Sequence, residues 1–338
     1  MARGLSSTFM SALQMHTGMG LTRLVETVKG DSTLCLEIRE NYINVYYRGG
    51  NLIKLSEKNG RYIAAFDMEY VKEQAFIKGV ELEEKYEFSM QYVVNQHNFQ
   101  QYALGWVLAL PKVWSSSSDI DQWIQGIPWL KHGMDLWLGS HPKNEREFQQ
   151  LVVRENNFGG SAKGTDYFIC DIEYDNHKGS RFDLIGAHWP STSSARKNNG
   201  DVRLAIIEMK YMDNALNGAS GILDHINKTK ESLALPELKA EMLNVFKQKR
   251  QLGLIDNQKD IGTFSNEKPE FIFVLANHDP DSGRLRNELK QLMDMSADEL
   301  DKLPFVIKIA TSNFMGYGLY DQSIYDLPTF MTIYKDRI

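Results

Sequence analysis

Asp183, Glu208 and Lys210 are the residues whose types and spacing could do chemistry. Glu208 and Lys210 end a strand-like run that begins with four apolar residues, Leu204 to Ile207. An ionised side chain in such a setting is costly unless it is paired, hydrated or bound to a metal. Side chains two positions apart on a strand share one face. The two charges therefore either mark the point where a strand leaves the core or belong to a site.

Asp183 offers a second carboxylate in a similar context, because it lies in the preceding strand-like stretch and is followed by apolar residues. If the two strands pair, Asp183 and Glu208 converge, and their repulsion favours a cation between them. Mg²⁺ or Mn²⁺ suits such a site, which leaves positions for water and substrate phosphate. Lys210 beside the metal could orient the attacking water or stabilise charge on phosphorus. An Asp, a Glu and a Lys on neighbouring strands are a suitable set for hydrolysing a phosphodiester.

The tripeptide Glu-x-Lys is a weak signal on its own. It also occurs at Glu83–Lys85, Glu237–Lys239 and Glu288–Lys290, in polar or helical contexts that predict solvated surface charges. Only Glu208–Lys210 ends an apolar strand, and the simpler interpretation even there is a strand-end ion pair.

The composition is that of a folded protein without a strongly charged surface. Hydrophobic residues make up 42% of the 338 residues, charged residues 24%, and the net charge is −6. This balance argues against coating nucleic acid through bulk charge but leaves room for a local basic groove. Cys35 and Cys170 suggest neither a disulfide framework nor a zinc site, and no apolar run is long enough to span a bilayer. We therefore expect a soluble cytoplasmic protein.

The second half of the chain predicts a mixed α/β domain. The expected order is a helix (144–156), three strands (166–175, 181–189 and 204–212), a helix (219–251), a strand (270–279), a helix (282–295) and a final strand (304–313). The long apolar central strands are typical of a sheet that is buried on both faces.

The first half predicts an α+β domain of a different kind. Strand-like runs occur between residues 32 and 70, and the pattern becomes helical from about Gln91 to Leu138, with Ser118 or Asp119 as a candidate helix cap. The tryptophans at 106, 114, 123, 129 and 137 are expected to be core, since aromatic side chains dominate burial. We place this domain at residues 1–138, with a recognition or regulatory role, and the α/β domain at 139–338.

The carboxylate and lysine pattern resembles the PD-(D/E)xK, or restriction-endonuclease-like, nuclease superfamily over roughly Glu145 to Ala310. That superfamily has an αβββαβ core with a mixed central sheet, an Asp on the second strand and a Glu-x-Lys on the third. The resemblance implies a Mg²⁺-dependent nuclease, acting on DNA rather than RNA, with Asp183, Glu208 and Lys210 as catalytic residues. Phe182 stands where the eponymous proline is expected.

The resemblance also implies two further site residues. The first helix of the family often carries a metal-linked Glu, which would be Glu145, with Glu147 as the competing choice. A polar residue on the second helix often binds substrate phosphate, and His225 has a similar placement, with Asp224 next to it. The metal ligands implied are thus Asp183, Glu208 and Glu145. Lys228, Lys230, Lys247, Lys249 and Arg250 are either phosphate contacts or a solvated helix face.

Two other functions stay open. One is a catalytically inactive nucleic-acid-binding module on the same fold, and the other is an unrelated protein-interaction module. His278, Asp279 and Asp281 suggest a second metal site, but a turn followed by a helix cap explains them more simply. A homodimer or a partner subunit, and a role in restriction, defence or repair, are further expectations by analogy.

Overall fold

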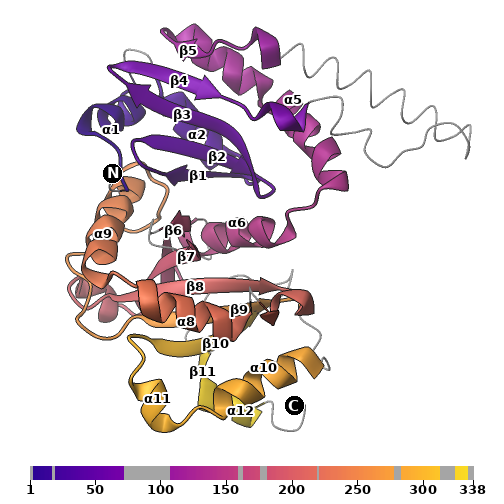
Figure 1. Ribbon diagram of the computed structural model, residues 1–338. Coiled ribbons are helices and arrows are strands. Elements are labelled where there is room, and N and C mark those ends of the chain that lie inside the picture. The colour runs from indigo at the N-terminus through magenta and orange to yellow at the C-terminus, as the bar shows by residue number, and fades with distance from the viewer. Residues whose placement is uncertain are drawn as a thin grey trace, which may run out of the picture. The chain divides into compact units, whose positions relative to one another are not determined.

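The computed structural model describes residues 3–16, 20–71, 107–158, 163–175, 181–218, 221–277, 283–312 and 324–333. The chain forms two compact units, residues 3–147 and 148–338, and the division falls inside a helix. The architecture is mixed α/β, as predicted, with one sheet in each unit (Figure 1). No helix in the described part of the chain is long and apolar enough to cross a membrane.

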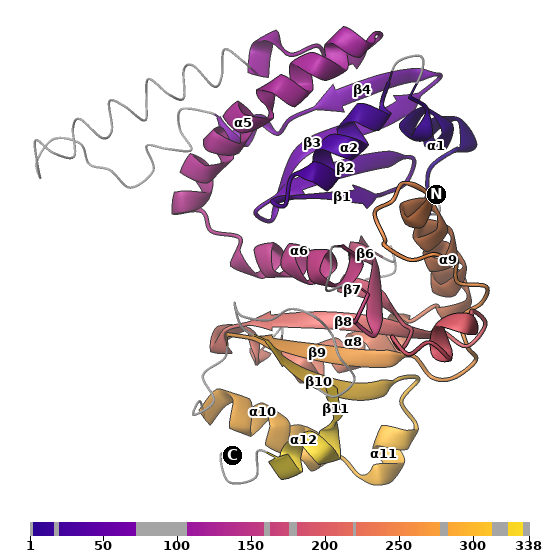
Figure 2. The same ribbon diagram turned by 180° about the vertical axis from the view of Figure 1, so that it is seen from behind.

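The N-terminal unit is built on a five-stranded antiparallel sheet in the order β1-β2-β3-β4-β5. Its strands are β1 (Leu34–Ile38), β2 (Tyr42–Tyr47), β3 (Gly50–Lys58), β4 (Arg61–Ala65) and β5 (Val113–Trp114), and its helices are α1 (Ser7–Gln14), α2 (Thr22–Gly30), the short 3₁₀ helix η1 (Met68–Tyr70) and α5 (Ser117–Ser140). Helix α2 lies against one face of this sheet, as Figure 2 shows from behind. The sequence analysis did not predict α1 and α2.

Left-handed backbone at Arg48 and Gly49 makes the β2–β3 turn. Two predicted details of this unit need correction. Helix α5 is capped by Ser116, which forms a reciprocal capping box with Asp119, so Asp119 is the third helical residue and not the cap. Trp114 and Trp123 are buried with their ring centroids 6.0 Å apart, which confirms their place in the core. Trp129 and Trp137 are only half-buried, so the prediction was wrong for these two.

The C-terminal unit contains a six-stranded mixed sheet in the order β11-β10-β9-β8-β7-β6. Its elements are α6 (Asn144–Asn157, which begins in the first unit), β6 (Tyr167–Asp175), β7 (Arg181–His188), η2 (Ala195–Lys197), β8 (Arg203–Tyr211), η3 (Asp213–Ala215), α8 (Ile222–Ser232), α9 (Leu235–Gln251), β9 (Glu270–Ala276), α10 (Gly283–Met293), α11 (Ala297–Asp301), β10 (Val306–Ser312), β11 (Ile324–Asp326) and α12 (Leu327–Ile333). Strands β8, β9 and β10 are parallel, and the other neighbours are antiparallel.

The predicted order of helix, three strands, helix, strand, helix and strand is confirmed. Strand β9 is buried at every position and β8 at all positions but its ends, as expected for central strands. The prediction of a single helix over 219–251 was wrong, because one helix ends at Ser232 and a new helix starts at Leu235. Pro236 explains the break: it fits the first turn of α9 but lacks the N–H that a continuous helix would need. The elements α11, β11 and α12 were not predicted.

A bulge in β6 at Cys170 is held by two side chains from neighbouring helices. Asn157 of α6 bonds both the N–H and the carbonyl of Ile169, at 2.7 and 2.8 Å. Lys249 of α9 is buried and donates to the Cys170 carbonyl at 3.1 Å. Lys249 thus satisfies backbone carbonyls inside the fold. The prediction that it lies on a solvated helix face or contacts a phosphate was therefore wrong. Trp106 and the segment with His278, Asp279 and Asp281 lie outside the described residues.

Candidate functional site

Strands β7 and β8 carry Asp183 and Glu208 to the same place. The two strands are antiparallel, and their last described pair at this end is Leu184 opposite Ile207. Extending this register by one residue sets Asp183 opposite Glu208. Residues directly opposite each other in an antiparallel pair share a face. The sheet thus presents both carboxylates on one face, with Lys210 two residues further along β8.

The Asp183 carboxylate ends the ladder between these strands. The Met209 backbone N–H, which points toward β7, donates to Asp183 Oδ2 at 2.8 Å. A side-chain oxygen therefore takes the donor that a continuing ladder would give to a backbone carbonyl. Because this bond fixes the carboxylate beside Glu208, the position of Asp183 is set by the backbone of the Glu-x-Lys segment itself.

Glu208 is held by two donors at one oxygen. Lys210 Nζ donates to Glu208 Oε1 at 2.9 Å, and His225 Nδ1 of α8 lies 3.1 Å from the same atom. Only 4% of the Glu208 side chain and 3% of the Lys210 side chain are exposed. Burial this complete makes the pair rigid and protects its charges from screening by salt.

The ionised form of Asp183 is destabilised by its surroundings. Burial raises its pKa well above the ordinary value, and the adjacent Glu208 carboxylate raises it further. The Met209 N–H and the Lys210 ammonium oppose this shift without cancelling it. A divalent cation placed between the carboxylates would remove the repulsion, because it stabilises both ionised forms.

His225 is neutral at pH 7. Burial lowers its pKa to about 4, and the charge of Lys210 acts in the same direction. Its contact with Glu208 is therefore a hydrogen bond, in which the Nδ1–H donates and Nε2 keeps its lone pair. Asp224, the neighbouring alternative, forms an ion pair at 2.6 Å with Lys228 one turn along α8.

The donor set fits a hard cation bound by two carboxylates. Among the described residues, no three His, Cys, Asp or Glu side chains are grouped as a protein-only metal centre would need. Mg²⁺ commonly uses one or two carboxylates together with waters and substrate phosphates. Glu145 lies in the first turn of α6, inside the unit that ends at Glu147, and its role as a ligand stays a prediction. The competing choice, Glu147, is 3.3 Å from the Arg48 guanidinium.

Phe182 takes the place of the expected proline for a packing reason. It is buried and stacks on Tyr174, its cross-strand partner in β6, with the ring planes 3° apart. This contact fixes β7 just before Asp183, so the aromatic residue can position the carboxylate without a proline.

A second buried carboxylate, Glu270 of β9, was not predicted. It accepts bonds from Tyr167 Oη at 2.7 Å and His188 Nδ1 at 3.0 Å, and Lys308 Nζ lies at 2.8 Å. Burial would raise its pKa, but His188 and Lys308 outweigh burial and lower the pKa to about 2. Glu270 pairs with Ala205, so it lies on the face opposite Glu208. These three partners sit on three other strands, β6, β7 and β10, and we interpret the cluster as structural. In the sequence, the one sign of this cluster was a single Glu at the start of an apolar strand.

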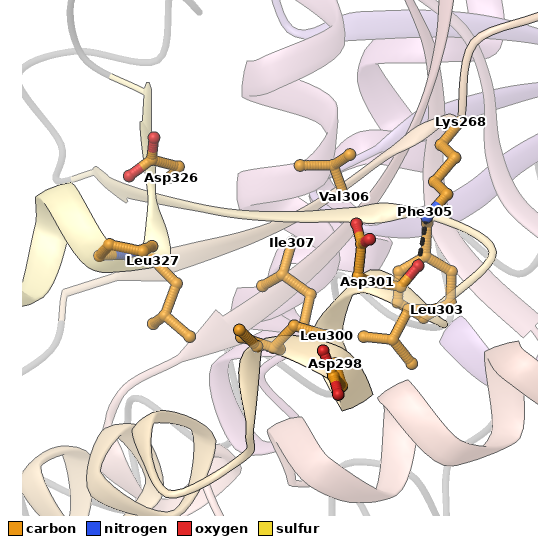
Figure 3. A pocket seen from close by; sticks show the side chains of 12 residues that line it. Lys268, Asp298, Leu300, Asp301, Leu303, Phe305, Val306, Ile307, Asp326 and Leu327 are labelled. Atoms are coloured by element: carbon orange, nitrogen blue, oxygen red, sulfur yellow. Dashed lines mark hydrogen bonds between the residues drawn. The ribbon is translucent and has the colours of Figure 1, made fainter.

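A cavity of about 560 Å³ lies elsewhere in this unit, between α11, the start of β10 and the start of α12 (Figure 3). Leu300, Phe305 and Leu327 line its apolar part, and the Lys268 ammonium closes one side by donating to the Asp301 carbonyl at 2.5 Å. None of the predicted site residues lines this cavity, so it is separate from the candidate site.

No family model matches the chain, and neither a curated protein nor a solved structure matches it.

Proposed function

We propose that this chain is a Mg²⁺- or Mn²⁺-dependent nuclease that hydrolyses phosphodiester bonds, with DNA as its preferred substrate. The observation that carries the proposal is the convergence of Asp183, Glu208 and Lys210 on one face of two paired strands. The order of elements and these three residues resemble the PD-(D/E)xK superfamily, which supports the same chemistry.

Each residue has a role that follows from its contacts. Asp183 and Glu208 would hold the metal, and the Met209 N–H and His225 keep the two carboxylates in place. When bound, the metal supplies a water of lowered pKa and offsets charge on the phosphate. Lys210 places its ammonium beside Glu208, where it can attract the scissile phosphate and stabilise the charge that develops on it. His225 is a positioning residue in this scheme, because its described contact is with Glu208.

A second candidate is a nucleic-acid-binding or protein-interaction module that does not cleave. The observation in its favour is the near-complete burial of the Glu208–Lys210 pair, which is also what a structural ion pair at a strand end would show. Metal dependence separates the two proposals.

The test uses purified full-length protein with single- and double-stranded DNA and RNA, in Mg²⁺, in Mn²⁺ and in EDTA. Cleavage in either metal but not in EDTA supports the nuclease. The absence of cleavage in both metals, together with no metal binding by calorimetry, would favour the module that does not cleave.

A further inference from the structure

One face of the N-terminal sheet is packed throughout. The other face is exposed at positions of β3, β4 and β5, whereas its β1–β2 part, with Glu37 and Asn44, is buried. Alternation along β4 buries Tyr62 and Ala64 and exposes Arg61, Ile63 and Ala65. In β3, Leu55 is buried and Lys54 is exposed. The strand registers bring Tyr42, Lys54, Lys58, Arg61, Ile63 and Val113 onto the exposed side, which we term the open face.

The exposed part of this face gathers three cations, while the carboxylate on the same face, Glu37, is buried two strands away from Lys54. Lys58 and Arg61 are direct cross-strand partners, an arrangement of like charges that is unfavourable by itself. In the described part of the chain, Lys54, Lys58 and Arg61 form no ion pair with an acidic residue. The adjacent carboxylate, Glu57, bonds instead to the Gly60 N–H at 2.7 Å and to the Asn41 amide at 3.1 Å. Such an arrangement favours an anion on this face.

Flat and apolar side chains lie among these cations. The Lys54 ammonium lies 4.3 Å from the centre of the Tyr42 ring, over its face. Ile63 and Val113 are opposite each other in the β4–β5 register, and they are 37% and 45% exposed although both are large and apolar. Lys54 and Lys58 are about 13 Å apart along β3, so cations border the apolar side chains over several residues.

We infer that the open face binds single-stranded nucleic acid, with phosphates on Lys54, Lys58 and Arg61 and bases on Tyr42 and the Ile63–Val113 pair. Proteins that bind single strands combine cations that follow the backbone with aromatic side chains on which bases stack. A duplex hides its base faces from Tyr42, whereas a single strand can present them. The inference rests on the proposed function, since it names a surface that would bind the substrate of the nuclease.

The test measures binding separately from cleavage. Fluorescence anisotropy of labelled 20-nucleotide single-stranded DNA and RNA is recorded with full-length protein in EDTA, over a range of salt concentrations. The variant Lys58→Gln/Arg61→Gln removes two cations and relieves their mutual repulsion, so we expect it to fold at least as stably as the wild type. Lys290→Gln/Lys302→Gln makes the same charge change at exposed positions of the other unit and is the matched control.

We expect Lys58→Gln/Arg61→Gln to weaken binding at least tenfold at low salt and to reduce the salt slope by about 1.4, or roughly 0.7 for each lost phosphate contact. Tyr42→Leu should weaken binding about fivefold or more while leaving the salt slope unchanged. The control double variant should bind like the wild type.

Two results would overturn the inference: no oligonucleotide binding by the wild type, or equal losses of binding in the control variant. Because both of these are measured in EDTA, they leave the nuclease proposal to be judged by metal-dependent cleavage.

Discussion

The Met209 backbone N–H bonds Asp183 Oδ2 at 2.8 Å and thereby ties the carboxylate of one strand to the backbone of the next. Met209 is the middle residue of Glu-x-Lys, and its neighbours Glu208 and Lys210 point to the face on which Asp183 lies. The same three-residue segment therefore supplies a carboxylate, an ammonium and the donor that orients the second carboxylate. A change in the β7–β8 register would move Asp183 away from all three of these groups.

Lys210 is expected to act on the reaction and not only on the fold. Lys210→Gln should reduce kcat by about 10²–10³-fold, the usual effect of removing one preorganised donor near developing charge. Lys210→Arg should restore part of the activity because it keeps the positive charge. Lys290→Gln, which alters another Glu-x-Lys tripeptide on the exposed side of α10, is the control and should leave kcat unchanged. Equal kcat values for Lys210→Gln and the wild type would make the lysine a structural partner of Glu208.

His225 is expected to act through Glu208. His225→Ala removes the donor at 3.1 Å from Glu208 Oε1 and should weaken Mg²⁺ binding about 10- to 100-fold, as losses of groups that orient metal ligands do. His225→Gln can still donate a hydrogen bond and should recover part of that affinity. Calorimetric titration with Mg²⁺ provides the readout, and unchanged affinity in His225→Ala would remove the residue from the site.

Asp183 should make the metal-free protein less stable as pH rises. Its folded-state pKa is raised, so its contribution to stability is full below the ordinary carboxyl pKa and is lost as pH rises through the folded value. Asp183→Asn removes this loss and should raise the metal-free Tm at pH 8 by roughly 2–4 °C or more, for about 1 kcal/mol.

The measurement is thermal unfolding in EDTA from pH 4 to pH 8, with the exposed Asp201→Asn as the control. If Tm depended on pH in the same way in the wild type and in Asp183→Asn, the pKa of Asp183 would not be raised in the folded protein.

Glu270 should have the opposite pH dependence. Its pKa is lowered from the usual 4.5 to about 2, so its stabilisation is complete above pH 4.5 and is lost as pH falls toward 2. The shift corresponds to about 3 kcal/mol. Glu270→Gln should therefore lose about that much stability at pH 7 and very little near pH 2. Urea unfolding at several pH values tests this, and Glu267→Gln, at an exposed partner of Arg203, should behave like the wild type.

The positions of the three candidate site residues could be predicted from the sequence, whereas several details of the fold around them could not. Asp183, Glu208 and Lys210 could be placed on one face because strand alternation has a fixed period and the apolar runs define two neighbouring strands. The Met209 hydrogen bond could not be predicted, since it depends on the β7–β8 ladder ending at Leu184, next to Asp183. Pro236 could have indicated the helix break, because proline lacks the N–H that a helix interior needs. The break was missed because polar and apolar residues continue to alternate across it.

The Glu270 cluster and the bulge at Cys170 were hidden for a different reason. Their partners come from strands and helices that are distant in sequence, and no local pattern marks Tyr167, Lys249 or Lys308 as belonging together. The open face of the first unit was equally hidden, because its cations gain meaning only when the strand registers bring them onto one side.

The most direct test of the central claim compares cleavage by the wild type and by Asp183→Ala in a titration with Mg²⁺, with Asp201→Ala as the control. We expect cutting that rises with Mg²⁺ in the wild type and in Asp201→Ala, and a rate at least about 100-fold lower in Asp183→Ala, because a direct ligand matters more than the groups that orient it. Circular dichroism should show the same fold in all three proteins. Metal-dependent cutting by Asp183→Ala at the wild-type rate would contradict the account and return Glu208 and Lys210 to a strand-end ion pair.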